Sequence, residues 1–373
     1  MKKNIALNII RWIVGLLFIF SGLIKANDPL GLSYKMQEFF ESWGWSWLNN
    51  YTLIFALIMN VFEVLAGVAV IIGWRMRLFS WLLLLLIIFF CFLTGYALLS
   101  GKIKTCGCFG DCLPLTPLQS FSKDFFLLLL IILIFIKSEK IKPLWQKNFL
   151  SSSVLFIVII GISILQFYVL KHLPLLDCLP YKVGNNINKE MSIPSNVVTD
   201  SFALTFRYKK NDKIIEFDAE HIPANLDSTY QFVERYDKLI RKGTDAPAIA
   251  DFALQNINGT DTTSAILNQQ NYYVLVFVQD FANWSNQQKQ FQQIATACKA
   301  KNIALFVVTA ASDDAEKILN NKLTILRCDA TIIKTAARVN ATYFLMQQAT
   351  ILAKNSYADA DEFINKLNRL KKN

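Results

Sequence analysis

Cysteine is the residue type with the clearest chemical potential in this sequence of 373 residues. Three of its seven cysteines, Cys106, Cys108 and Cys112, lie in one short stretch that reads Cys-Gly-Cys-Phe-Gly-Asp-Cys. A disulfide between Cys106 and Cys108 would close a very small ring, and strained disulfides are more easily reduced. Gly107 and Gly110 leave the backbone free to approach that geometry. The stretch therefore predicts three candidate redox thiols that exchange electrons with a quinone or with a partner thiol.

The same cysteines allow two other interpretations. One is a structural disulfide that fixes the loop, for example Cys108 with Cys112 or Cys112 with Cys178. The other is a zinc site, although three cysteines without a histidine form a poor ligand set, so we expect no metal. Lys102 and Lys104 lie just upstream and could favour a thiolate, which is the reactive form of cysteine.

The elements that must position these cysteines are long apolar segments. Hydrophobic residues make up 54% of the sequence, and most of the excess falls before Leu170. The runs cover Asn4 to Leu23, Tyr51 to Trp74, Leu78 to Leu99, Phe125 to Ile136, and Phe149 to Leu170. The fourth run crosses a bilayer only if its helix begins near Pro117, whereas the others reach the roughly 20 residues that a crossing needs. We expect five transmembrane helices.

Basic residues are denser in the segments on one side of these helices. With the N-terminus in the cytoplasm, the inner segments hold Lys2, Lys3, Arg75, Arg77, Lys137, Lys140, Lys142 and Lys147. The longer outer loops hold Lys25, Lys35, Lys102, Lys104 and Lys123. Basic residues are enriched on the cytoplasmic side of membrane proteins. We therefore expect the loop that carries Cys106, Cys108 and Cys112, called the cysteine loop below, to face outward, together with everything after Leu170. In a bacterial inner membrane that side is the periplasm, an oxidising compartment.

Two charged residues interrupt the first two apolar runs. Arg11 lies inside the first run, and Glu63 lies midway along the second. A lone charge in the bilayer core costs about 2.5 kcal/mol or more on insertion scales. One interpretation is a structural Arg11–Glu63 pair that holds two antiparallel helices together. The other is that Glu63 belongs to a proton or quinone site.

The part after the fifth run has the pattern of a mixed α/β fold. Phe202 to Lys209 and Ile214 to Phe217 predict a hairpin that turns at Asn211-Asp212. From Gly243 onward, predicted strands and helices alternate in a βαβ unit followed by a β-hairpin and a closing helix. The strands cover Tyr272 to Val278, Ile303 to Thr309, Leu323 to Arg327, Thr342 to Met346 and Ala349 to Ala353.

Two motifs together resemble a known membrane family. The segment from Gly15 to Gly31, Gly-Leu-Leu-Phe-Ile-Phe-Ser-Gly-Leu-Ile-Lys-Ala-Asn-Asp-Pro-Leu-Gly, looks like the first-helix signature of DoxX-type proteins. The Cys-Gly-Cys-Phe-Gly stretch from Cys106 to Gly110 is similar to the methylamine-utilisation MauE branch of that superfamily. The resemblance covers residues 1 to about 140. It implies a four-helix membrane bundle associated with redox processes and with the maturation of periplasmic partners.

The tail resembles the thioredoxin fold of the TlpA and peroxiredoxin kind. The resemblance rests on the segments Ala246 to Leu254, Asn258 to Asp261 and Tyr273 to Val278. An active member carries Cys-x-x-Cys after that strand, but this chain has Gln-Asp-Phe-Ala-Asn-Trp-Ser-Asn-Gln. The usual cis-proline is also missing near Asn340-Ala341. We therefore expect this domain to bind rather than to catalyse, and Cys298 and Cys328 to be buried thiols or one bridge.

The sequence thus predicts a membrane α-helical bundle followed by a thioredoxin-like α/β domain. We expect a DoxX/MauE-like bundle of four helices at 1–140, a fifth linking helix within 141–176, a small β-containing linker at 177–242 and the thioredoxin-like domain at 243–373. The net charge is +10, but the basic residues do not form a patch with interleaved aromatic residues, as a nucleic-acid site would. We therefore expect the basic residues to contact the bilayer. No cofactor is evident beyond a possible quinone, and a periplasmic protein is a possible partner. The function is either thiol–disulfide exchange at the loop or that of a non-enzymatic scaffold.

Overall fold

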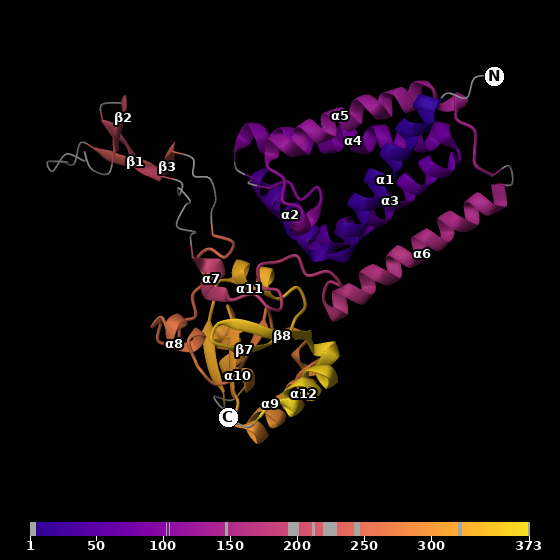
Figure 1. Cartoon of the computed structure of the whole chain (residues 1–373). Helices are drawn as coiled ribbons and strands as arrows, with labels where there is room; N and C mark the ends of the chain where they lie inside the picture. Colours follow the sequence, from indigo (N-terminus) through magenta and orange to yellow (C-terminus); the bar gives the residue numbers. More distant parts are fainter. Residues whose placement is uncertain are drawn as a thin grey trace.

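Five long apolar helices form the N-terminal half of the protein (Figure 1). In this computed structural model, the described residues are 5–101, 103, 105–145, 148–192, 201–210, 213–218, 230–241, 247–319 and 323–371. The helices are α1 (Ile5–Asn27), α3 (Thr52–Ile72), α4 (Met76–Ser100), α5 (Pro117–Ile136) and α6 (Asn148–His172). All five are long and apolar enough to cross a membrane, as the sequence predicts. The fourth begins at Pro117, where Thr116 and Gln119 form a capping box.

Glycine lets α1 and α3 pack closely. A Cβ atom on Gly15 would lie 2.8 Å from the carbonyl oxygen of Gly67, and one on Gly22 would lie 2.6 Å from Cγ2 of Val64. Small residues at such crossings bring helix backbones together in a bilayer, where packing contacts drive association. The two antiparallel helices are therefore fixed at a defined axial level, with Gly22 of α1 beside Glu63 of α3.

A short helix and a 3₁₀ turn connect α1 to α3. They are α2 (Pro29–Ser42) and η1 (Ser46–Tyr51), neither of which the sequence predicts. Asp28 caps α2 by accepting a hydrogen bond from the backbone N–H of Gly31 at 3.0 Å, and Pro29 occupies the first helical position, where its missing N–H costs nothing. This segment covers one end of the bundle.

Helix α6 is held to the bundle by polar groups inside the apolar region. The amide of Asn60 in α3 donates to Oε1 of Gln166 at 3.0 Å, and Gln166 donates to the carbonyl of Leu57 at 3.3 Å. Both side chains are buried. Interhelical hydrogen bonds of this kind stabilise helix association in lipid.

The C-terminal domain is built on a five-stranded mixed sheet of order β6-β5-β4-β7-β8. The strands are β4 (Tyr273–Val278), β5 (Ala304–Thr309), β6 (Thr324–Arg327), β7 (Thr342–Gln347) and β8 (Thr350–Ser356). The first three are mutually parallel, and β7 and β8 run antiparallel. The helices of this domain are α8 (Thr263–Leu267), α9 (Gln288–Lys301), α10 (Ser312–Leu319), α11 (Ala330–Ala336) and α12 (Ala360–Arg369). The predicted mixed α/β layout is confirmed.

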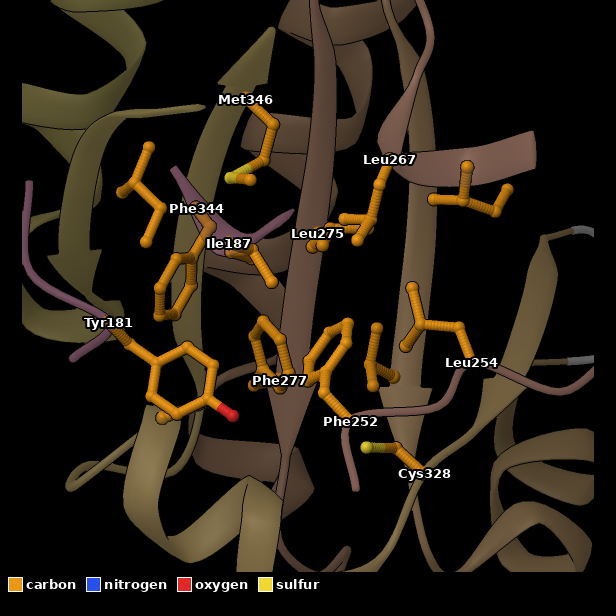
Figure 2. Close-up of a cluster of buried hydrophobic side chains, with 14 of the residues drawn as sticks. Tyr181, Ile187, Phe252, Leu254, Leu267, Leu275, Phe277, Cys328, Phe344 and Met346 are labelled. Carbon is orange, nitrogen blue, oxygen red and sulfur yellow. The ribbon is translucent and has the colours of Figure 1, made fainter. Parts of the chain in front are cut away.

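All six residues of β4 are buried because both faces of the sheet are covered. Leu275 and Phe277 belong to one apolar cluster, shown in Figure 2, and Val274 and Val276 belong to another. Alternation along the strand places the two clusters on opposite faces of the sheet.

Residues that the sequence assigns to a linker belong to this domain. Tyr181, together with Ile187 of α7 (Ile187–Met191), packs in the same cluster as Phe277 (Figure 2). The backbone N–H of Ile187 donates to the carbonyl of Ala349 at 2.8 Å. The α/β domain therefore starts well before residue 243, because these apolar side chains complete one face of the sheet.

A separate three-stranded sheet is inserted between α7 and the rest of the domain. Strands β1 (Ser201–Lys210) and β2 (Lys213–Asp218) form the predicted hairpin, whose turn lies outside the described residues. Strand β3 (Gln231–Arg241) pairs with β1 and was not predicted, because five charges among its 11 residues hide the strand pattern. The N–H of Ile249 donates to the carbonyl of Glu190 at 3.1 Å, so the insertion leaves and re-enters the domain at adjacent points.

Candidate functional site

The cysteine loop lies between the end of α4 and the start of α5 and is packed against α1 and α2. The ring of Phe109 contacts that of Phe20 edge-on, with centroids 5.6 Å apart. Gly110 lies against Ile24, and Gly107 lies against the stem of Lys35; both glycines have positive φ. A side chain at either position would be strained, so the two glycines allow the loop to lie flat on the bundle.

Cys108 joins the loop to buried acidic groups of the bundle. Its thiol lies 3.9 Å from Oδ2 of Asp124, to which it donates. Asp124 is fully buried, and Nζ of Lys123 lies 2.5 Å from its other oxygen. The hydroxyl of Ser21 lies 3.0 Å both from the Cys108 carbonyl and from Oε2 of Glu63. Because a serine has one proton to donate, it can satisfy only one of these acceptors at a time.

The partner of Glu63 is Lys25, not Arg11. Lys25 donates to Oε1 of Glu63, and the two side chains are 3% and 0% exposed. Gly22 lies beside Glu63, so Arg11, 11 residues earlier on α1, is about 16 Å away along the helix axis. The predicted Arg11–Glu63 pair is therefore wrong, because counting from the helix ends misjudged the axial level of α3.

Arg11 has a different role at the opposite end of the bundle. Its guanidinium donates to the carbonyl of Lys142 at 3.0 Å, in the connection that follows α5. The Cβ position of Gly73, at the end of α3, lies 3.2 Å from the same guanidinium nitrogen. Arg11 thus ties three segments together near the N-terminal end of α1.

Burial keeps both free loop thiols protonated near neutral pH. Desolvation raises the pKa of Cys108 to about 11, and it also raises the pKa of Cys106. The nearby cation of Lys123 opposes the shift at Cys108 without overcoming it. Lys102 and Lys104, expected to favour a thiolate, lie outside the described residues. The loop cysteines are therefore thiols that lose a proton only to an acceptor placed close to them.

The third loop cysteine is bonded to the segment that follows α6. Cys112 forms a disulfide with Cys178, one of the pairings that the sequence left open. Cys106 and Cys108 are free. Cys298 and Cys328 are also free and lie in the clusters on opposite faces of the sheet, so they are separate core thiols.

The α/β domain contacts the membrane bundle beside the cysteine loop through Arg338. Its guanidinium donates to Oδ2 of Asp28 at 2.8 Å and to Oδ2 of Asp111 at 2.6 Å. The side chain is only 6% exposed. Burial alone would lower the pKa of Arg338, but the two carboxylates raise it overall. Tyr34 of α2 lies against the same guanidinium, with 5.4 Å between the ring centroid and Cζ.

An ion pair and a hydrogen-bond contact fasten α6 and the chain after it to this domain. Nζ of Lys354 in β8 lies 2.7 Å from Asp177, next to the disulfide. Nδ1 of His172, at the end of α6, lies 2.7 Å from Asp359. Together with Arg338 and the disulfide, they fix the domain at the end of the bundle that carries the cysteine loop.

A cavity of about 530 Å³ opens between α1, α2, α3 and α4 directly below the loop. Cys106 and Cys108 line it together with the side chains of Lys25 and Lys123. Among the side chains that the structure describes, no group of three or more histidine, cysteine, aspartate or glutamate residues could hold a metal ion.

One family model matches most of the membrane part. Residues 3–137 match the family model of methylamine utilisation protein MauE. The N-terminal part of the protein is MauE-like. Residues 202–242 match a domain of unknown function, DUF8463, which covers the inserted sheet. No curated protein and no solved structure matches the chain.

The end of β4 in the α/β domain lies next to the MauE-like part. Amide side chains are found there, at the position where an active thioredoxin carries its Cys-x-x-Cys thiols. The side chain of Gln279 donates to the carbonyl of Ala337, and its backbone N–H donates to Oδ1 of Asn340 at 3.0 Å. The peptide bond between Asn340 and Ala341 is cis. Gln279 also accepts a hydrogen bond from Tyr34 of α2 at 3.4 Å. This junction therefore contacts the membrane bundle and has no group for thiol chemistry.

Sequence reasoning found the cysteines but missed most of their neighbours. Ser21 and Lys25 are four residues apart and lie on one face of α1, a spacing visible in the sequence. Asp124 lies just before the fourth apolar run and is buried beside Cys108, a position that its place in the sequence does not reveal. Arg338 had no signal, because its partners are 310 and 227 residues away in the chain.

Proposed function

We propose that this MauE-like membrane protein is redox-associated and that Cys106 and Cys108 perform thiol–disulfide exchange at the periplasmic face of the inner membrane. In each cycle the two thiols are oxidised to a disulfide while a partner accepts two electrons and two protons. The observation that carries the proposal is a pair of free cysteines, separated by one residue, beside a buried carboxylate. Cys112 is bonded elsewhere, so its role is to hold the loop rather than to cycle.

The buried carboxylate supplies what a protonated thiol needs. Asp124 accepts from the Cys108 thiol and is held in place by Lys123. A general base within reach can take the proton as the sulfur forms its new bond. Reaction is thereby confined to conditions in which a partner has reached the loop, because the resting thiols are poor nucleophiles.

The orientation proposed for the membrane follows from charge and from the disulfide. Three basic residues lie at the end of the bundle away from the loop, which fits a cytoplasmic position: Arg75, Arg77 and Lys140. The Cys112–Cys178 disulfide lies at the loop end, and such bonds persist in oxidising compartments.

The α/β domain resembles thioredoxins in its strand pattern, and we propose that it acts by binding. Its β4 junction, without cysteine, contacts the MauE-like part through Gln279, while Arg338 binds Asp28 and Asp111. In this arrangement the domain holds the loop of its own chain. A periplasmic protein would need another surface of the domain, or would have to displace this contact.

The test of the proposed function is the thiol state of Cys106 and Cys108 in intact cells. Rapid acid quenching, alkylation and mass spectrometry of the loop peptide should recover both the dithiol and the disulfide form. A Cys298→Ser variant, which changes a core thiol, should leave that ratio unchanged. Recovery of one form alone under both oxidising and reducing growth conditions would refute the redox cycle.

The alternative is a non-enzymatic scaffold whose α/β domain binds a partner. The amide-filled junction at Gln279 favours this function, because nothing there can exchange electrons. A variant with Cys106→Ser and Cys108→Ser separates the two functions. A scaffold keeps its cellular phenotype in that variant, whereas a redox protein loses it while the protein still accumulates in the membrane.

A further inference from the structure

The cavity below the cysteine loop has apolar walls along the helices and polar groups toward the loop. Its walls are large apolar side chains such as Ile58, Phe62 and Leu86. At the loop end it is lined by Cys106, Cys108 and the hydroxyl-bearing Thr94. A volume of about 530 Å³ lies within the range of small-molecule sites, which combine apolar walls with a few polar groups.

The polar end of the cavity carries donors but little net charge. Three lysines line it, and each is paired with a carboxylate: Lys25 with Glu63, Lys123 with Asp124, and Lys35 with Glu38. A phosphate group would compete with these carboxylates for the lysines and would leave at least one carboxylate unpaired. A neutral head with carbonyl oxygens can accept hydrogen bonds there without breaking the pairs. The charge pattern therefore favours an uncharged carbonyl compound over a phospholipid head.

The walls also favour a flat ring. Phe39, Phe62 and Phe90 line the cavity, and Trp43 lies beside Phe39 with ring centroids 5.7 Å apart. Aromatic side chains pack well against planar rings in stacked or edge-on arrangements. An apolar tail attached to such a ring would extend along the lipid-facing residues of α3 and α4, such as Ile58 and Leu85, which are exposed.

We propose that this cavity binds a membrane quinone, with its ring carbonyls at the loop and its tail toward the lipid, and that the quinone oxidises Cys106 and Cys108. The inference rests on the proposed function and names its electron acceptor. The two S–H bonds break and one S–S bond forms between the sulfurs. The two electrons and two protons that leave convert the quinone to the hydroquinone, so atoms and charge balance.

Protonation of the resting thiols fits an acceptor of this class. A quinone takes up protons together with electrons, so the thiols need not ionise in advance. Asp124 can relay the Cys108 proton, and Lys25 and Lys123 lie where developing charge on the ring oxygens would be stabilised.

Binding is tested on the full chain in lipid nanodiscs with decylubiquinone as the probe. Quenching of tryptophan fluorescence reports the binding. The wild type and the Cys106→Ser, Cys108→Ser variant should both bind saturably, because binding does not need the thiols. Leu85→Trp places bulk in the cavity wall and should weaken binding by about tenfold or more. The matched control is Ile88→Trp on the same helix, which is equally exposed but does not line the cavity.

The redox step is tested by mixing the reduced protein with decylubiquinone without oxygen. We expect one hydroquinone per Cys106–Cys108 pair in the wild type and none in the double serine variant. Equal loss of binding in both tryptophan variants, or quinone that never displaces bound phospholipid, overturns the inference. So does saturable binding without hydroquinone formation. If the thiol pair still cycles in cells after such a result, the proposed function stands with a different acceptor. A pair that never cycles refutes the proposed function itself.

Discussion

The buried ion pair between Lys25 and Glu63 predicts a large loss of stability when one partner alone is removed. The two side chains are 3% and 0% exposed, and they lie between α1 and α3. Glu63→Gln leaves the buried ammonium group of Lys25 without its carboxylate. Removing one partner of a buried pair typically costs about 3–5 kcal/mol. For a bundle of this size that corresponds to a fall in melting temperature of about 6–20 °C.

The assay is thermal unfolding of the full chain in a mild detergent. Unfolding is measured as the loss of the monodisperse peak in size-exclusion chromatography after heating. The matched control is Glu139→Gln, which removes the partner of Arg77. That pair is 3.8 Å long and its side chains are 86% and 80% exposed, so its loss should cost less than about 1 kcal/mol.

The double variant Lys25→Met with Glu63→Leu separates pairing from function. Two apolar residues of similar volume should restore most of the stability, because replacing a buried pair is often neutral. If Glu63→Gln melts at the same temperature as Glu139→Gln, or if the double variant is no more stable than the single one, the reasoning is refuted. If the double variant folds but no longer oxidises its thiols, the pair also serves the cavity that Lys25 lines.

Three further changes test other parts of the structure. Gly67→Val should prevent stable folding, because its Cβ would lie 2.7 Å from a backbone oxygen of α1. The control Gly161→Val should fold, because a Cβ at that position has no neighbouring atom in contact. Equal yields of the two variants in membranes would contradict the close packing of α1 and α3. Arg338→Gln should loosen the α/β domain, seen as faster trypsin cleavage of the full chain. Unchanged cleavage would mean that Arg338 is not needed to hold the domain in place. With a pKa of about 11, Cys108 should be alkylated slowly at pH 7 and about tenfold faster per pH unit up to pH 10, and a rate that levels off near pH 8.5 would refute the raised pKa.

The helices of the membrane part were predictable because their signal is local. Each apolar run carries its own length and hydropathy, and Pro117 marks where α5 starts. Helix α2 has no such signal, since its 14 residues mix polar and aromatic side chains. Its place is set by contacts with distant residues, including the hydrogen bond from Tyr34 to Gln279.

The candidate site was only partly predictable, for a physical reason. Spacing alone singled out Cys106, Cys108 and Cys112 without separating the two free thiols from the bonded one. The partner of Glu63 depends on how far α1 slides along α3. That level is set by Gly15 against Gly67 and Gly22 against Val64, a packing detail without a sequence rule of its own. The pairing of Cys112 likewise depends on where the chain goes after α6.

The α/β domain brings a positive charge, Arg338, to two carboxylates beside the cysteine loop. Asp28 and Asp111 lie at the loop, and unpaired carboxylates nearby would oppose formation of any thiolate. Arg338 carries one positive charge and offsets one of these two negative charges, so docking of the domain makes the surroundings of the loop less negative than they would be in the membrane part alone. Undocking would remove that positive charge and expose the β4 junction at the same time. A partner with acidic side chains could compete for Arg338, and in doing so would couple its own binding to the chemistry of Cys106 and Cys108.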